Sequence, residues 1–348
     1  MTIMMHFVKR ACFIGLLICV TSCGGRCSQV QNQDRSASEE EEDTYMNMQY
    51  PIEVNISREY DKRTIILQDV AEVSYIPLET NKDVLLDGIS MISQSVSDSL
   101  VVMNNLSGSF FVMDRDGRLI SGFNHTGRGP GEYSRVGLGQ YTVDFGAKEI
   151  YIVSYPLDYK IMVYSFNGDF KREIEIPKPL WIRDLANFDT NNLLVCTTTS
   201  NSREGRKELF TPYYLVSKQT GEYNPLPIEV LETTDGKIRQ MVGDEYRVIS
   251  ISSSPIIRNG DEFFISDFAS DTIYSLKSEN LSPFITLKPL PEQKRQNVFA
   301  GLEFKSTRYS LLNIFGTDEE TEKFTQKYIV VDHKTGELFE PEFRNNDF

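Results

Sequence analysis

Beyond Tyr50 the chain alternates short apolar runs with polar turns. Residues 52–56 (IEVNI) alternate apolar and polar side chains, which is the period of a half-buried β-strand. Residues 73–78 continue this signal, and residues 64–70 between them predict one short helical turn. The later runs lie at 99–103, 110–113, 141–144, 149–153, 160–164, 193–197, 213–217, 246–251, 255–258, 262–265, 272–276 and 328–331. Tight polar turns between such runs are typical of antiparallel sheets, so the pattern predicts an all-β fold.

A longer period runs through the turns. Gly117, Gly168 and Gly221 end similar apolar runs and stand 51 and 53 residues apart. Gly336 lies 115 residues beyond Gly221, which corresponds to two more steps with the intervening turn at 278–280. A period near 50 that carries three or four strands is the size of a β-propeller blade. The alternative is a β-sandwich, in which turns fall every 8 to 12 residues without a longer period.

Length, charge and cysteines limit the alternatives. An all-β unit can hold 348 residues as one domain. The net charge of -14 excludes nucleic acid as a partner, because phosphate binding requires clustered Lys and Arg. Of the five cysteines, Cys27 and Cys196 lie outside the N-terminal apolar segment, which excludes a disulfide framework. Cys196 falls in an apolar run and is expected to be buried.

The N-terminus has the features of an export signal. Lys9 and Arg10 precede the apolar run 11–20, which is about as long as a secretory h-region and too short to span a bilayer. The small residues before Cys23 resemble the lipobox of bacterial lipoproteins, in which the leader is removed and the cysteine carries the lipid. An ordinary cleaved signal with a chance cysteine is the alternative. The predicted domains are therefore a signal peptide (1–22), a disordered acidic tether (23–49) and a propeller (50–348).

Several motifs resemble a known family. The DRDGR turn (114–118), the loop GRGPGEY (127–133) and the strand 149–153 resemble an NHL repeat. Together with IPLET (76–80) and DTIY (271–274), they resemble the six-bladed β-propeller lipoproteins of Bacteroidetes. The resemblance implies an NHL- or TolB-like six-bladed fold in the cell envelope of a Gram-negative bacterium.

Two questions about that resemblance stay open in the sequence. Related chains generally continue with more strands, so either the N-terminal strands complete the last blade or that blade is incomplete. No acidic cluster directly follows Cys23, although such a cluster is the surface-export signal of some Bacteroidetes lipoproteins. The sequence therefore leaves undecided whether the chain lies on the periplasmic or the outer-membrane side.

The glycine-rich loop 127–133 has two interpretations. In the structural one, Gly127, Gly129 and Gly131 all adopt positive φ and Pro130 fixes a sharp passage between blades. Arg128 and Glu132 then tie neighbouring loops together, and Tyr133 caps an apolar edge. In the functional one, the loop points into a central channel and binds an anionic or sugar-like ligand. The candidate ligand-binding residues are Arg128, Glu132, Tyr133 and His125.

A calcium site is the remaining candidate chemistry. The carboxylates of Asp114, Asp116, Asp144 and Asp271 could converge at the propeller axis, because Ca²⁺ prefers oxygen ligands. Alternatively they are ordinary turn residues. Without a Gly-x-Ser-x-Gly or His-Glu-x-x-His motif, the sequence favours a non-enzymatic protein without a cofactor.

Three functions fit these features. The first is a lipid-anchored binding module for an envelope protein or glycan. The second is a calcium-dependent propeller hydrolase or lyase that acts on a lactone or polysaccharide. The third is a scaffold for an outer-membrane uptake or signalling complex.

Overall fold

The computed structural model defines the fold of the chain from Tyr50 onward, with gaps. The described residues are 50–79, 91–134, 136, 140–154, 160–176, 180–199, 209–230, 236–243, 245–251, 254–288, 298–318 and 321–347. The predicted leader, Cys23 and the predicted tether lie outside this part. The described chain divides into two compact units: one begins at Ser74 and ends at Glu232, and the other combines residues 50–73 with the part from Thr233 onward.

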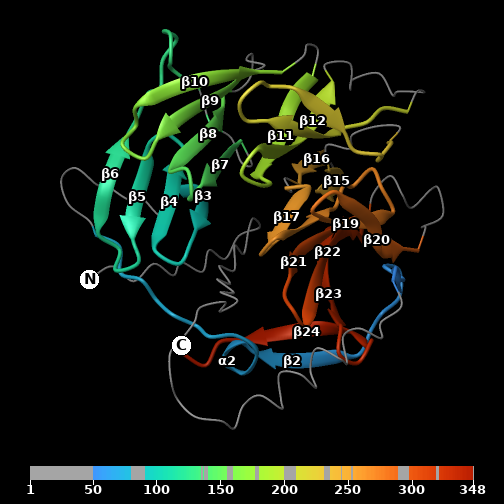
Figure 1. Ribbon diagram of the computed structural model, residues 1–348. Coiled ribbons are helices and arrows are strands. Elements are labelled where there is room, and N and C mark those ends of the chain that lie inside the picture. Colours follow the sequence, from blue (N-terminus) through green and yellow to red (C-terminus); the bar gives the residue numbers. More distant parts are fainter. Residues whose placement is uncertain are drawn as a thin grey trace, which may run out of the picture. The chain divides into compact units, whose positions relative to one another are not determined.

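The first unit contains three antiparallel sheets, each made of four strands in sequence order (Figure 1). The first sheet consists of β3 (Met91–Val96), β4 (Leu100–Asn105), β5 (Phe110–Asp114) and β6 (Leu119–Phe123). The second consists of β7 (Tyr141–Asp144), β8 (Glu149–Val153), β9 (Lys160–Ser165) and β10 (Phe170–Glu175). The third consists of β11 (Leu180–Asn187), β12 (Asn192–Thr199), β13 (Tyr213–Ser217) and β14 (Tyr223–Pro225).

The second unit contains two more such sheets and a separate hairpin. One sheet consists of β17 (Ile256–Asn259), β18 (Glu262–Ile265), β19 (Thr272–Lys277) and β20 (Asn280–Leu287). The other consists of β21 (Phe299–Lys305), β22 (Tyr309–Thr317), β23 (Phe324–Asp332) and β24 (Leu338–Arg344). The hairpin consists of β15 (Lys237–Val242) and β16 (Glu245–Ser250).

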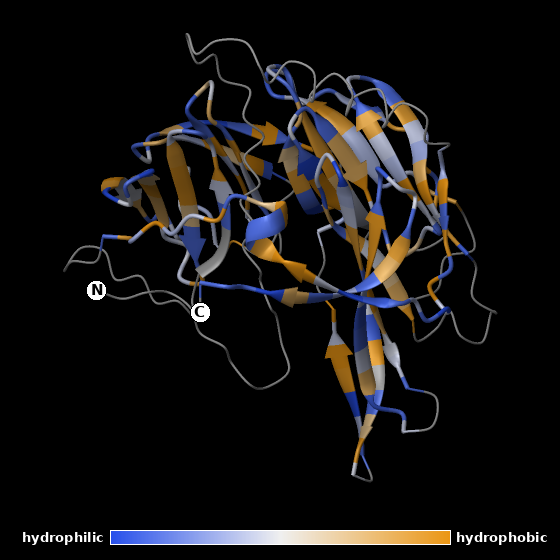
Figure 2. Cartoon of the chain, turned by 90° about the horizontal axis from the view of Figure 1, so that it is seen from below, coloured by the Kyte–Doolittle hydropathy of each residue, from blue (hydrophilic) through white to orange (hydrophobic). Residues whose placement is uncertain are grey.

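The middle strands of the first two sheets are buried on both faces, as the apolar runs in the sequence require. All five residues of β8 are buried. Ile150 and Ile152 pack in a core shared with the first sheet, whereas Tyr151 and Val153 pack in a core shared with the third. Figure 2 shows apolar and polar residues in alternation along many of the strands. Because opposite faces of one strand join different cores, the three sheets of the first unit are stacked face to face.

The turn glycines predicted from the period occupy one equivalent position. Gly117, Gly168, Gly221 and Gly336 each lie between the third and fourth strands of a sheet, with φ between +73° and +88°. Ser278 has a φ of +53° in the same turn of the fifth sheet. The predicted period and its placement are therefore confirmed, and Cys196 is fully buried as expected.

The first strands of successive sheets also contact one another. β7 contacts β11 in the first unit, and β17 contacts β21 in the second. By contrast, two N-terminal strands pair with fourth strands. β1 (Ile52–Val54) lies parallel to β20, and β2 (Lys62–Ile66) lies parallel to β24.

The N-terminal segment corrects two expectations from the sequence. The last sheet has four strands of its own, so β1 and β2 add fifth strands at sheet edges and do not complete a missing blade. The residues predicted as a helical turn form the end of β2 and the short helix α2 (Leu67–Val70).

Residues 73–78 are not a strand. They pack against the turn at Gly117, where the Glu79 N–H donates to the Gly117 carbonyl at 2.8 Å. The Leu119 N–H in turn donates to the Glu79 carboxylate at 2.9 Å. The IPLET and DRDGR motifs are therefore in direct contact.

We expect Gly117→Ala to destabilise the protein more than Gly260→Ala. Both glycines have positive φ, +80° and +62°, where an L-residue costs about 1 kcal/mol or more. A Cβ on Gly117 would also overlap the Pro77 carbonyl, whose carbon would lie 2.9 Å away, whereas a Cβ on Gly260 meets no atom within 4 Å. Such overpacking adds about 1–3 kcal/mol. Urea unfolding of both variants measures this difference, and equal losses would contradict the close packing at Gly117.

Candidate functional site

Tyr133 anchors the glycine-rich loop from within the core. Its side chain is fully buried, and its hydroxyl donates to the Gly108 carbonyl at 2.6 Å and accepts from the His125 N–H at 3.1 Å. Burial raises the pKa of Tyr133 to about 12. The Glu132 carboxylate accepts from the Gly129 N–H at 2.7 Å, which closes the turn. Two of the four predicted loop residues therefore hold the loop itself.

His125 connects the loop to the neighbouring sheet. Its Nε2 lies 2.7 Å from the Gly168 carbonyl oxygen, and its ring stacks on Tyr164 at 5.4 Å between centroids. The Tyr164 hydroxyl donates to the Gly131 carbonyl at 2.6 Å. Of the four candidate ligand-binding residues, Arg128 and Glu132 are exposed, and the Glu132 carboxylate already accepts from the Gly129 N–H.

The loop glycines differ from the prediction. Gly131 alone of the three has positive φ, at +73°. Gly127 is required for a different reason, because a Cβ there would overlap the Glu132 carboxylate. At Gly129 a Cβ would lie 3.2 Å from the same carboxylate. The prediction that all three glycines supply positive φ was therefore wrong for Gly127 and Gly129.

The four aspartates proposed as calcium ligands have separate local partners. Asp114 accepts from the N–H groups of Asp116 and Arg118 at 2.9 and 2.8 Å, and Asp116 pairs with Arg118. Asp271 is exposed beside Thr272 in the second unit. In the described ranges, no three His, Cys, Asp or Glu side chains form a group that could hold a metal ion.

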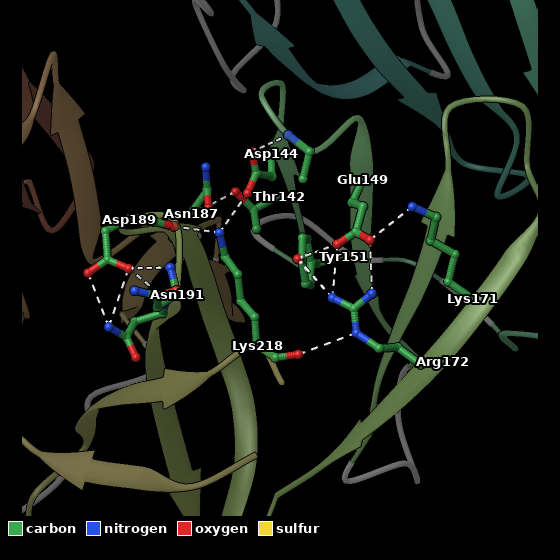
Figure 3. Close-up of polar contacts among 12 residues, drawn as sticks. Thr142, Asp144, Glu149, Tyr151, Lys171, Arg172, Asn187, Asp189, Asn191 and Lys218 are labelled. Carbon is green, nitrogen blue, oxygen red and sulfur yellow. Dashed lines mark hydrogen bonds and ion pairs between the residues drawn. The ribbon is translucent and has the colours of Figure 1, made fainter. Parts of the chain in front are cut away.

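Asp144 instead belongs to a buried charged network between the second and third sheets (Figure 3). It ends β7, and its Oδ2 accepts from the Lys218 Nζ at 2.7 Å. Lys218 follows β13 and is only 3% exposed. Its Nζ also donates to the Asp189 carbonyl. Burial by itself raises the pKa of Asp144, but the hydrogen bonds from Lys218 and from the Ala147 N–H outweigh it and lower the pKa.

A second ion pair extends the network along the same interface. Arg172 on β10 binds Glu149 through two nitrogens, each at 2.9 Å. The Tyr151 hydroxyl and Lys171 also donate to Glu149, at 2.6 and 3.0 Å. The hydrogen bonds from Arg172 lower the pKa of Glu149 to about 2 despite its burial. Because the Arg172 Nε also donates to the Lys218 carbonyl at 3.3 Å, the two ion pairs form one continuous network.

The second unit has the equivalent position, occupied by other residues. His333 follows β23 as Lys218 follows β13, and the backbone N–H of each donates into the turn before the second strand, to Arg308 and Asn191 at 2.7 and 2.8 Å. His333 is 2% exposed, and its Nε2 lies 2.8 Å from the Ser310 Oγ. Burial lowers the pKa of His333 to about 4, so the ring is neutral at pH 7.

Sequence reasoning missed Lys218, Arg172 and Glu149 because a lysine in a Gly-containing turn and charges at strand ends are typical of exposed positions. The signal for Lys218 was the repeat itself. In the other three sheets with a glycine turn, its equivalents after the third strand are Arg115, Phe166 and His333, which are large residues of no common polarity. What these residues have in common is their position, at which a long side chain packs beside the turn. The network pairs buried charges with each other and thereby fixes two sheets together.

We expect Lys218→Met to destabilise the protein by about 3–5 kcal/mol, because it leaves the Asp144 carboxylate buried without its cation. The double variant Lys218→Met/Asp144→Leu should recover most of this loss, since it removes both charges. Lys160→Met is the matched control: its ion pair with Glu173 is 39% exposed on the lysine side, and such pairs contribute about 0–1 kcal/mol. Denaturant unfolding of the four proteins provides the comparison. If the double variant were as unstable as the single one, the charge pairing would not be the cause.

Among the residues that the structure describes, no helix has both the length and the apolar character that a membrane span requires.

A search of curated proteins finds no match. A solved structure with a similar fold is a "Putative exported protein" from Bacteroides fragilis, with a TM-score of 0.58 and 14% identity over 83% of this chain and 79% of that one.

The structure of BamB from Moraxella catarrhalis is a more distant match. It has a TM-score of 0.31 and 12% identity over 69% of this chain and 70% of that one, which is too weak to support an argument. The family described as "Domain of unknown function (DUF4934)" matches residues 51–343. This match spans nearly all of the chain from Tyr50 onward, and the protein therefore belongs to the DUF4934 family.

Proposed function

We propose that this protein is a lipid-anchored β-propeller of the cell envelope that acts as a non-enzymatic binding module for an envelope protein or glycan. The observation that carries the proposal is the repeated four-stranded meander. Five such sheets occur in the described ranges, and each has its tight glycine or serine turn between the third and fourth strands. The six-bladed ring that the family resemblance implies is part of this proposal.

Sheet packing within each unit supports the propeller. Strands within a blade follow sequence order, and the blades stack face to face with their first strands innermost. The contacts of β7 with β11 and of β17 with β21 agree with that arrangement. So does the assignment of alternate residues of β8 to two different cores. A two-layer sandwich would bury only one face of each sheet.

The residues of the buried network support a binding role without catalysis. Lys218, Asp144, Glu149 and Arg172 neutralise one another across the sheet interface, and such pairs fix structure. The chemistry presented to solvent lies at the loop 127–133. There Arg128 is exposed, and Phe170, which is 44% exposed, packs over Gly131. A loop that exposes a guanidinium and packs against a partly exposed aromatic ring suits an acidic sugar or a carboxylate-bearing peptide.

The features of an export signal support a location in the cell envelope. The N-terminal apolar run, the small residues before Cys23 and the acidic tether are arranged as in lipoproteins, and the Bacteroides fragilis neighbour is described as exported. Stable anchoring by lipid requires more than one acyl chain, which an N-terminal lipidated cysteine supplies. A tether between the lipid and the first strand would give the binding module reach.

We expect Cys23→Ser to abolish lipid attachment, whereas Cys27→Ser leaves it unchanged. The two cysteines lie in the same segment, so the pair separates the lipobox position from a nearby thiol. Labelling of cells with an alkyne fatty acid, followed by separation of membranes, measures both attachment and location. The parent and Cys27→Ser should carry the label and sediment with membranes. Labelling of Cys23→Ser at the level of the parent would contradict the anchor.

We also expect Arg128→Ala to weaken ligand binding at least tenfold without lowering the melting temperature. Arg118→Ala, which changes an arginine that is 72% exposed in the turn before β6, is the control and should bind as the parent does. The measurement is a glycan array together with capture from envelope extracts, followed by titration of the best ligand. If the parent binds nothing in either assay, or if the two variants bind equally well, the proposed loop site is contradicted. Chelator-sensitive turnover of a lactone or polysaccharide would instead favour the hydrolase or lyase.

A further inference from the structure

The hairpin β15–β16 differs from the repeated sheets. It consists of two strands inserted between β14 and β17, and β15 contacts β22 and β23. The Met241 N–H donates to the Glu322 carbonyl at 3.2 Å, and the Phe324 N–H donates to the Gln240 Oε1 at 3.2 Å. On the inner face Ile238 is fully buried, next to Phe299. The hairpin is thus held mainly through β15. β16 is its outer strand and adds one contact, in which the Tyr246 hydroxyl donates to the Glu322 carboxylate at 3.2 Å.

The outer strand β16 has the properties of a sheet edge that can pair with a strand of another chain. Tyr246 and Val248 are 62% and 58% exposed, and Glu245 and Arg247 are exposed as well. The pairing of β16 with β15 is continuous and shows no bulge. Within the described ranges, no strand lies on the other side of β16. Natural edge strands are usually protected by charged side chains, especially lysine, by proline, by a bulge or by a covering segment. β16 contains no lysine or proline, and its two charges, Glu245 and Arg247, have opposite signs.

We propose that β16 pairs in antiparallel orientation with β16 of a second copy of this chain. Two copies related by a two-fold axis perpendicular to the sheet place one residue opposite itself. When that residue is Tyr246, Glu245 of each copy lies opposite Arg247 of the other. The dimer then contains two Glu245–Arg247 pairs on the same face of the sheet, and such opposite-charge pairs stabilise the strand pairing.

Neighbouring registers lack this complementarity. With Arg247 on the axis, two like charges lie directly opposite each other, which is destabilising. With Val248 on the axis, Arg247 lies opposite Ile249 and the charges have no cross-strand partner. The strand is therefore self-complementary in one register, and a second copy is the partner that carries the matching sequence in the required order.

The pairing also supplies what the hairpin lacks. A two-stranded ribbon is marginally stable in water, whereas three or more strands with an apolar face are stable. Two paired hairpins form a continuous four-stranded sheet in the order β15, β16, β16 and β15. The added strand pairs cover the backbone edge of β16 in both copies.

Cysteine cross-linking of the full chain tests the register. In the proposed dimer the two Tyr246 Cα atoms are about 4.5–5.5 Å apart, which is within the range for a disulfide. Tyr246→Cys should therefore give disulfide-linked dimers on mild oxidation, well above the background from the natural cysteines of the parent. Ser250→Cys is the matched control, because its two copies lie roughly 27 Å apart along the paired strands. Equal cross-linking of both variants would overturn the register.

Charge reversal tests the contact independently of any cysteine. In the full chain in detergent, Glu245→Arg or Arg247→Glu alone should raise the dimer dissociation constant at least tenfold. The double variant Glu245→Arg/Arg247→Glu restores opposite charges and should return to within about threefold of the parent. Sedimentation equilibrium measures the three variants and the parent. A monomeric parent, or a double variant as weak as the single ones, would overturn the proposal. So would a parent whose β16 edge is occupied by a strand of another protein.

Discussion

The structure depends on sheets that have two apolar faces and cannot cover either face alone. In β8, alternate residues belong to two different cores, so the second sheet must lie between two neighbours. The same constraint applies in the second unit, where β18 and β22 both contribute to one core through Phe264 and Leu312. Removing any one sheet would expose the faces of its neighbours. Repetition along the chain is therefore a physical requirement of the fold.

This stacking determines how charged groups are accommodated. A lysine or glutamate between two sheets loses its hydration and is tolerated only with a partner. Lys218 and Asp144 meet this condition across the interface of the second and third sheets, and Arg172 and Glu149 meet it beside them. Such pairs add little net stability compared with apolar side chains. They do specify which sheet faces meet, since a mismatched neighbour would leave a charge unpaired. His333 fills the equivalent position as a neutral ring.

Strand positions and the turn period could be predicted because both follow from local rules. β7, β8, β13 and β18 agree with the predicted runs to the residue. Non-local features could not be predicted. Residues 73–78 look like a strand, but they pack on the Gly117 turn, where Pro77 lacks the N–H that a ladder needs. The parallel pairing of β1 and β2 brings together residues more than 200 positions apart.

In the candidate site, too, local features could be predicted from the sequence and non-local ones could not. Tyr133, His125 and Glu132 were recognised from a compact motif, but their roles depend on neighbours that the motif does not specify. Gly127 is a glycine because the Glu132 side chain turns back over it, which no backbone preference reveals. Lys218 could not be distinguished from an exposed turn lysine until the depth of its turn was known. Sequence therefore located the loop, whereas the buried network required the structure.

The outer edges of the sheets show how the chain limits unwanted pairing. β20 and β24 are covered by β1 and β2, so residues 52–66 also protect two edges. β14 is short and ends in Pro225. β10 carries four charged side chains and a bulge between Phe170 and Arg172. Coverage, shortness, charge and bulges are the known ways to protect an edge. Among the described residues β16 by contrast has no bulge and no covering strand, and its two charges, Glu245 and Arg247, have opposite signs. This edge is therefore the one for which we propose pairing with a second copy.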